Sequence, residues 1–91
     1  MSQPAPTLSG EIRELLVELA DTLVRVRPGA EMSEAIRLAR PLVLAERLHG
    51  PGEKAFATET QLIAALPHVR DGQTRDEYAA QLRLIAQGVT Q

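Results

Sequence analysis

The chain has 91 residues, of which 44% are hydrophobic and 24% charged, and this composition is typical of one small globular domain rather than a disordered or membrane protein. Ten basic and twelve acidic residues give a net charge of −2, which produces no field that would draw nucleic acid or anionic lipid. The absence of cysteine excludes disulfides and thiolate metal sites.

Residues 1–7, which include Pro4 and Pro6, are predicted to be a flexible lead-in to a single helical domain over residues 8–91. The lead-in lacks the basic start and apolar run of a signal peptide. No stretch of the sequence approaches the ~20 consecutive apolar residues that cross a bilayer. We therefore expect a cytoplasmic protein that has no membrane attachment.

The first helix is predicted over residues 10–27. Ser9 is suited to cap its N-terminus, while Glu11 in the first turn and Arg25 in the last turn match the helix dipole. Pro28 ends the helix. Apolar residues recur at spacings of three and four, which makes one side of this helix hydrophobic. These residues are Ile12, Leu15, Leu16, Leu19, Leu23 and Val26.

The second helix is predicted over residues 33–49, and Gly50 is suited to end it. Pro41 interrupts the helix, because proline cannot donate a hydrogen bond to the carbonyl of Arg37. The segment is therefore either one kinked helix or two shorter ones. We favour one helix kinked at Pro41, since two apolar stripes keep helical spacing across the proline. These stripes are Ile36, Ala39 and Val43, and Leu38, Leu42, Ala45 and Leu48.

The third helix is predicted over residues 53–66, and its start has two interpretations. Residues 58–61 have the spacing of a capping box, which would start the helix at Glu59. Phe56 and Ile63 are seven residues apart and share one face only if the helix starts earlier. We adopt the earlier start for this reason.

The fourth helix is predicted over residues 74–88. Thr74 and Glu77 have the spacing of a capping box at its N-terminus. Apolar residues then repeat at helical spacing as far as the end of the chain. They are Tyr78, Leu82, Ile85 and Val89.

No window shows the alternating pattern of a half-buried strand, so the predicted fold is an all-α compact bundle of about four helices. The short loops favour antiparallel packing of helices that are neighbours in sequence. Phe56 and Tyr78 are the only aromatic residues, so aliphatic side chains must fill the core. Because a small aliphatic core leaves a modest stability margin, we expect a homo-oligomer, most simply a dimer.

Few residues are candidates for catalysis or metal binding. Glu46 and His49 have the spacing of a ligand pair on one helical face, but a carboxylate-bridged metal site needs a second such pair. His68, the other histidine, has no glutamate three residues before it. His49 is better explained as a base at the C-terminal end of a helix. We expect no catalytic residue, no metal site and no cofactor.

The second helix offers a candidate surface for binding another protein. Residues 42–44 are consecutive and apolar, so they point in three directions and cannot all pack against one neighbour. Arg40, Leu44 and Arg47 lie along one stripe of this helix, and Arg37 lies at its edge. An apolar residue framed by arginines resembles an interface hot spot. These four residues are the predicted partner-binding site.

A structural role for the same residues is the alternative. Leu44 would then belong to the core, and the arginines would pair with Glu14, Glu18 or Glu34. On the binding interpretation, the protein is a non-enzymatic interaction module such as a small adaptor, an assembly factor or an inhibitor. Its partner is another protein, whose identity the sequence does not give.

The alternative function is that of a small helix-turn-helix regulator that binds DNA through the third and fourth helices. In that case polar residues at the start of the fourth helix would read bases and nearby arginines would contact phosphates. Three acids on the same surface, Asp71, Asp76 and Glu77, make DNA the less favoured partner. The candidate DNA-binding residues are Arg70, Gln73, Thr74, Arg75 and Arg83.

Overall fold

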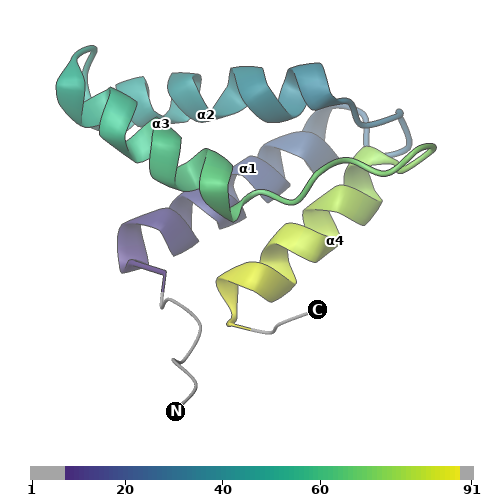
Figure 1. Cartoon of the computed structure of the whole chain (residues 1–91). Helices are drawn as coiled ribbons and strands as arrows, with labels where there is room; N and C mark the ends of the chain where they lie inside the picture. Colours follow the sequence, from purple (N-terminus) through teal and green to yellow (C-terminus); the bar gives the residue numbers. More distant parts are fainter. Residues whose placement is uncertain (1–7, 89–91) are drawn as a thin grey trace.

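The computed structural model describes residues 8–88, which form four α-helices arranged as two pairs (Figure 1). In one pair α1 (Gly10–Val26) packs along α4 (Arg75–Ala86), and in the other α2 (Glu34–His49) packs along α3 (Glu53–Ala65). The two pairs lie across each other. The predicted all-α bundle of four helices is confirmed.

Local capping interactions fix the ends of three helices as expected. The hydroxyl of Ser9 accepts a hydrogen bond from the Ile12 amide at 3.2 Å, and Ser33 caps α2 in the same way. At the start of α4, the Thr74 amide donates to a carboxylate oxygen of Glu77 at 2.9 Å, while the Glu77 amide donates to the Thr74 hydroxyl at 3.4 Å. These contacts satisfy amides that have no partner within the helix. The predicted start of α1 is confirmed, and α2 and α4 each begin one residue after the predicted start.

The α2 helix runs through Pro41 without a break, so the interpretation as one helix is confirmed and the interpretation as two is wrong. The Pro41 ring is fully buried, and its packing offsets the hydrogen bond that the proline cannot make. Beyond α2, Gly50 and Gly52 have positive φ angles of 77° and 140°, which glycine adopts readily. The chain therefore reverses within a short turn, and α3 lies directly beside α2.

The earlier of the two predicted starts of α3 is the correct one. Thr58 lies in the interior of this helix and is buried, on the same side as Ala55 and Leu62. The start near Glu59 was wrong. The packing of the buried side of α3 extends the helix to residues before Thr58, so Thr58 does not act as its cap. The last helical residue is Ala65, one residue before the predicted end.

The expectation that helices adjacent in sequence pack together holds for α2 and α3 but is wrong for α1. The main neighbour of α1 is α4, the last helix, and α3 makes few contacts with α4. The loops after α1 and after α3 are long enough for the chain to cross between the pairs. They also bond to each other, since the Met32 amide donates to the Gln73 carbonyl at 2.8 Å and the Arg75 amide to the Ala30 carbonyl at 2.8 Å.

The core lies between the two helix pairs and is aliphatic apart from Tyr78, which is fully buried. Phe56 is 57% exposed and does not contribute to it. Within residues 8–88, no helix is both long enough and apolar enough to span a membrane. The predicted lead-in over residues 1–7 lies outside the described residues. The largest fully buried side chains are Tyr78, Leu16, Leu19, Leu62, Leu82 and Pro41.

Candidate protein-interaction surface

The side of α2 that points away from the core is apolar. Five residues lie within an arc of about 140° around this helix, and we call them the outer face of α2. Leu38 is 48% exposed and Val43 is 46% exposed, while Leu42 is half-buried. A helix that packs on one side is normally polar on the other, so this surface is unusual. The residues of the outer face are Ala35, Leu38, Ala39, Leu42 and Val43.

Charged residues border the outer face on one long edge and at one end. Arg40 and Arg47 lie along the edge next to Val43, one turn before it and one turn after it. Arg40 is exposed and makes no ion pair with any residue that the structure describes. The guanidinium of Arg47 lies 3.5 Å from the carboxylate of Glu18, and both side chains are largely exposed, so this pair contributes little to stability. Glu46, which is half-buried, ends the face.

The prediction that Leu44 is an exposed anchor is wrong. Leu44 is 5% exposed and belongs to the hydrophobic core. The inner side of α2 also includes Arg37, Pro41 and Ala45, which are all buried. The structural alternative describes this side of the helix correctly, since Leu44 is in the core and two of the arginines pair with Glu18 and Glu34. The binding interpretation placed Leu44 on the solvent side of α2, and the structural interpretation placed it on the side that packs in the core.

Arg37 is only 7% exposed, so its expected position at the edge of a binding surface is also wrong. Its Nε donates to a carboxylate oxygen of Glu34 at 2.7 Å. Its Nη1 donates to the Leu66 carbonyl at 3.4 Å, and its Nη2 lies 3.4 Å from Nδ1 of His68. The contacts with Leu66 and His68 join α2 to the segment that follows α3. Arg37 therefore has a structural role and is not free to bind a partner.

Glu34 completes this connection between α2 and the loop. Its Oε1 accepts a hydrogen bond from the Val69 amide at 2.7 Å, while its Oε2 binds Arg37. The hydrogen bonds from Val69 and Arg37 hold the pKa of Glu34 below its usual range. The Arg37–Glu34 pair thus fixes the first turn of α2 to the chain that leaves α3.

Tyr78 attaches the same segment to α4. Its hydroxyl donates to the Pro67 carbonyl at 2.6 Å, and its side chain is fully buried. Burial raises the pKa of the Tyr78 hydroxyl above its usual range. Both Tyr78 and Arg37 therefore use their polar groups to satisfy backbone carbonyls of residues 66 and 67.

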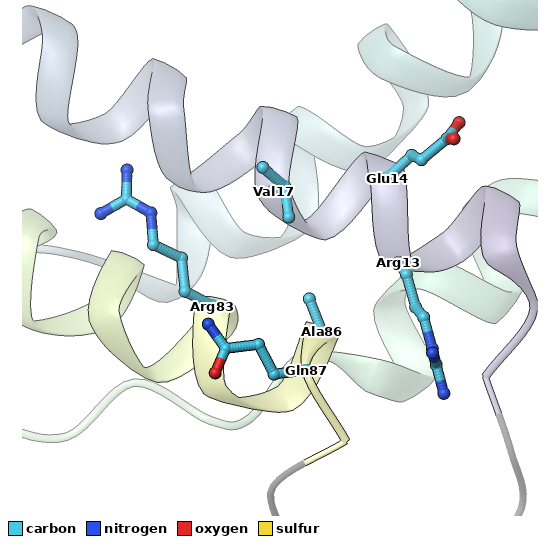
Figure 2. Close-up of a pocket in the computed structure, with 6 residues that line it drawn as sticks. All are labelled: Arg13, Glu14, Val17, Arg83, Ala86 and Gln87. Carbon is cyan, nitrogen blue, oxygen red and sulfur yellow. The ribbon is translucent and has the colours of Figure 1, made fainter.

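A concave region of about 350 Å³ lies between α1 and α4 (Figure 2). Val17 and Ala86 supply its apolar part. In Figure 2 the charged ends of Arg13, Glu14 and Arg83 point in different directions. The Arg83 guanidinium is paired with the carboxylate of Asp21 at 2.9 Å. Convergent polar groups are needed for catalysis or ligand recognition, and this groove does not show them. The lining residues are Arg13, Glu14, Val17, Arg83, Ala86 and Gln87.

The helix-turn-helix geometry expected of α3 and α4 is not present in the described residues. Such a motif requires two consecutive helices that pack together at a tight turn. Here α3 packs on α2 and α4 packs on α1. The segment between α3 and α4 instead bonds to the loop that follows α1.

The side chains expected to contact DNA are largely engaged in structural contacts. Gln73 is 4% exposed, accepts a hydrogen bond from the Arg70 amide at 3.1 Å and donates one to Gln81 at 3.1 Å. Thr74 caps α4, and Arg75 is half-buried. Arg83 forms the ion pair with Asp21 on the α1 side of the molecule. Of the five candidates, Arg70 is the one with high exposure, so the structure does not bring them together as one surface.

Groups that suggested chemistry in the sequence lie apart from one another. Within residues 8–88, no three His, Asp or Glu side chains lie close enough together to hold a metal ion. His49 is the last residue of α2, and its Nε2 lies 2.8 Å from a carboxylate oxygen of Glu11. The hydroxyls of Ser9 and Ser33 are engaged in helix caps.

Sequence analysis missed Leu38 and Val43 as candidate binding residues, although the signal was present. Three consecutive apolar residues on α2 indicated that one of them must face solvent, and the flanking arginines favoured Leu44 over Val43.

Comparison with known proteins identifies no relatives, because no family model, curated protein or solved structure matches this chain significantly.

Proposed function

We propose that this protein is a non-enzymatic interaction module, such as a small adaptor, an assembly factor or an inhibitor, that binds another polypeptide through the outer face of α2. The observation that carries the proposal is the apolar outward side of a helix whose inward side is already packed in the core. Contiguous apolar surface on a small domain is typical of contact sites. Interface centres are also depleted in charge and enriched in neighbouring arginine, which fits Arg40 and Arg47.

The other exposed hydrophobic side chains do not form a comparable surface. Val17 and Val26 lie on α1, Phe56 on α3 and Leu84 on α4, while Leu48 lies near the C-terminal end of α2, outside the outer face. Single apolar residues are ordinary features of protein surfaces and need no partner. The outer face of α2 differs because its members are adjacent on one helix.

A non-enzymatic role fits the use that the fold makes of its polar side chains. Arg37, Glu34 and Tyr78 bind backbone groups of the loop that follows α3. Such contacts hold helices in place, so these three side chains serve the fold rather than a reaction. We further propose a cytoplasmic location, as expected from the sequence, and cell fractionation tests this.

The occupant of the outer face is either a second copy of the chain or a different protein. The small core favours self-association on general grounds, so a homodimer remains a prediction. Light scattering of the purified protein measures this directly. If α2 forms the dimer contact, Leu38→Glu should convert the dimer into a monomer.

Site-specific photo-crosslinking in the native host tests the proposed function. A benzophenone amino acid at Ala39 would lie at the centre of the outer face, and we expect it to form an adduct of defined mass on illumination. The same group at Val26, which is 61% exposed on α1, is the matched control and should form no such adduct. The proposal fails if position 39 gives no adduct, or if both positions give the same ones. The adduct mass also shows whether the occupant is a second copy.

A further inference from the structure

We infer that the outer face of α2 binds an amphipathic helix of a different protein, and that acidic residues border the apolar stripe of this helix along one edge. The inference rests on the proposed function and specifies the chemistry of the partner. Three observations carry it: the shape of the outer face, the charge along its edge, and the consequence of pairing the face with itself.

The outer face has the dimensions and relief of a helix-binding surface. Ala35 and Val43 are eight residues apart, so the face extends about 12 Å along the α2 axis. Ala35 and Ala39 lie one turn apart and form a low row, while Leu38 and Leu42 form a higher row beside it. Helices pack when a ridge of one enters such a groove of the other. An apolar ridge of a partner helix is therefore a suitable occupant for the row of alanines.

The charge along the edge of the outer face is basic. Arg40 has no ion-pair partner among the described residues, and the weak contact of Arg47 with Glu18 leaves its guanidinium exposed. Both guanidinium groups can reach a helix that lies on Val43, because each is one turn from this residue. Acids at the matching edge of the partner would satisfy them and exclude basic partners. Glu46 lies at the end of the face and would repel an acidic residue of the partner, so the acidic edge of the partner helix should not extend past Glu46.

Pairing of the face with a second copy would place like charges together. The face is centred at Ala39, midway between Ala35 and Val43, so Arg40 lies one residue from its centre. In a two-fold dimer of antiparallel α2 helices, the same edge of each helix meets, with the axes about 8–10 Å apart. Arg40 of one copy would then lie beside Arg40 of the other copy. This repulsion favours a different protein as the occupant.

Two synthetic helical peptides test the acidic edge. Both have about 20 residues and the same stripe of leucine and alanine, but one has glutamate along one edge and the other has lysine there. We expect the glutamate peptide to bind at least about tenfold more tightly at low salt, since two ion pairs replace two like-charge contacts. The preference should decrease as the ionic strength rises. Fluorescence anisotropy of the labelled peptides measures both dissociation constants.

Variants of the protein assign this preference to particular residues. Arg40→Glu with Arg47→Glu should reverse the order of the two peptides, whereas Arg25→Glu, an exposed charge reversal on α1, should leave it unchanged. Leu38→Glu with Val43→Glu should abolish binding of both peptides without loss of helical content.

The outcomes separate this inference from the proposed function. Equal binding of both peptides would overturn the acidic edge and retain the outer face as a binding surface. A dimer that dissociates on Leu38→Glu would overturn the inference of a different partner and still support the proposed function. Absence of binding by either peptide would overturn the inference, and a crosslink at Ala39 but not at Val26 would leave the proposed function intact.

Discussion

Arg37 and Arg40 are one turn apart on α2, yet the fold uses them in different ways. Arg37 is buried, donates hydrogen bonds to the Glu34 carboxylate and the Leu66 carbonyl, and contacts the His68 ring. Arg40 is exposed and makes no ion pair with a described residue. Both residues are arginines on the same helix, so the residue type does not distinguish them. Only the three-dimensional position separates a structural arginine from one that is free to bind.

Alanine substitution at these two positions should show this difference. We expect Arg37→Ala to lower the free energy of unfolding by about 2 kcal/mol, because it removes charged hydrogen bonds and leaves the Leu66 carbonyl without this donor. The matched variant Arg40→Ala should change it by less than about 0.5 kcal/mol. Urea unfolding followed by circular dichroism measures both values. Equal effects at the two positions would contradict the structural role of Arg37.

At the scale of a single helix, α2 has apolar residues on both its sides, and only one side is packed. Leu44 is 5% exposed, and Leu38, about 120° away around the helix axis, is 48% exposed. Substitution of a buried leucine by alanine leaves a cavity, whereas substitution of an exposed leucine does not. The orientation of α2 can therefore be measured with the same substitution at two positions.

We expect Leu44→Ala to destabilise the protein by about 2–4 kcal/mol and Leu38→Ala by less than about 1 kcal/mol. Because ΔG of unfolding for a domain of this size is small, Leu44→Ala should visibly lower the thermal midpoint. Differential scanning calorimetry of both variants measures the change. A larger loss for Leu38→Ala would mean that α2 presents its other side to the core.

The helices themselves could be predicted from the sequence because their signals are local. Ser9, Ser33 and Thr74 cap the amides of their own next turn, and this requires no knowledge of distant residues. The packed side of α2 could not be predicted in the same way. Leu38 lies on an apolar stripe and Leu44 lies between two arginines, yet Leu44 is the one that packs in the core, because its burial depends on where the other helices lie. The prediction therefore placed Leu44 on the solvent side of α2, whereas this residue lies in the core.

At the scale of the whole molecule, the pairing of helices was the least predictable feature. The turn between α2 and α3 is so short that these helices must be neighbours, and the sequence shows this at Gly50 and Gly52. The longer loops allow several arrangements of α1 and α4. Contacts between residues far apart in sequence select one of them, including the Arg83–Asp21 ion pair.

The backbone contacts between the two long loops also complete the N-terminus of α4. The amides of Arg75 and Asp76 lie in the first turn of this helix and have no partner within it. They donate instead to the carbonyls of Ala30, at 2.8 Å, and Pro28, at 2.9 Å, in the loop after α1. This pairing therefore connects α1, α2 and α4 at one end of the molecule.

Hydrogen exchange should show that these loop amides belong to the cooperative structure. We expect the amides of Met32, Arg75 and Asp76 to be protected to a degree similar to amides inside the helices, because their hydrogen bonds break only when the loop after α1 separates from the loop before α4 and from the start of α4. The amide of Asp71, in the exposed part of the loop before α4, is the internal control and should exchange rapidly. Exchange followed by two-dimensional NMR resolves each amide. Exchange of Met32 and Arg75 as fast as that of Asp71 would mean that the loops separate without unfolding, and that the two helix pairs are held together by the core alone.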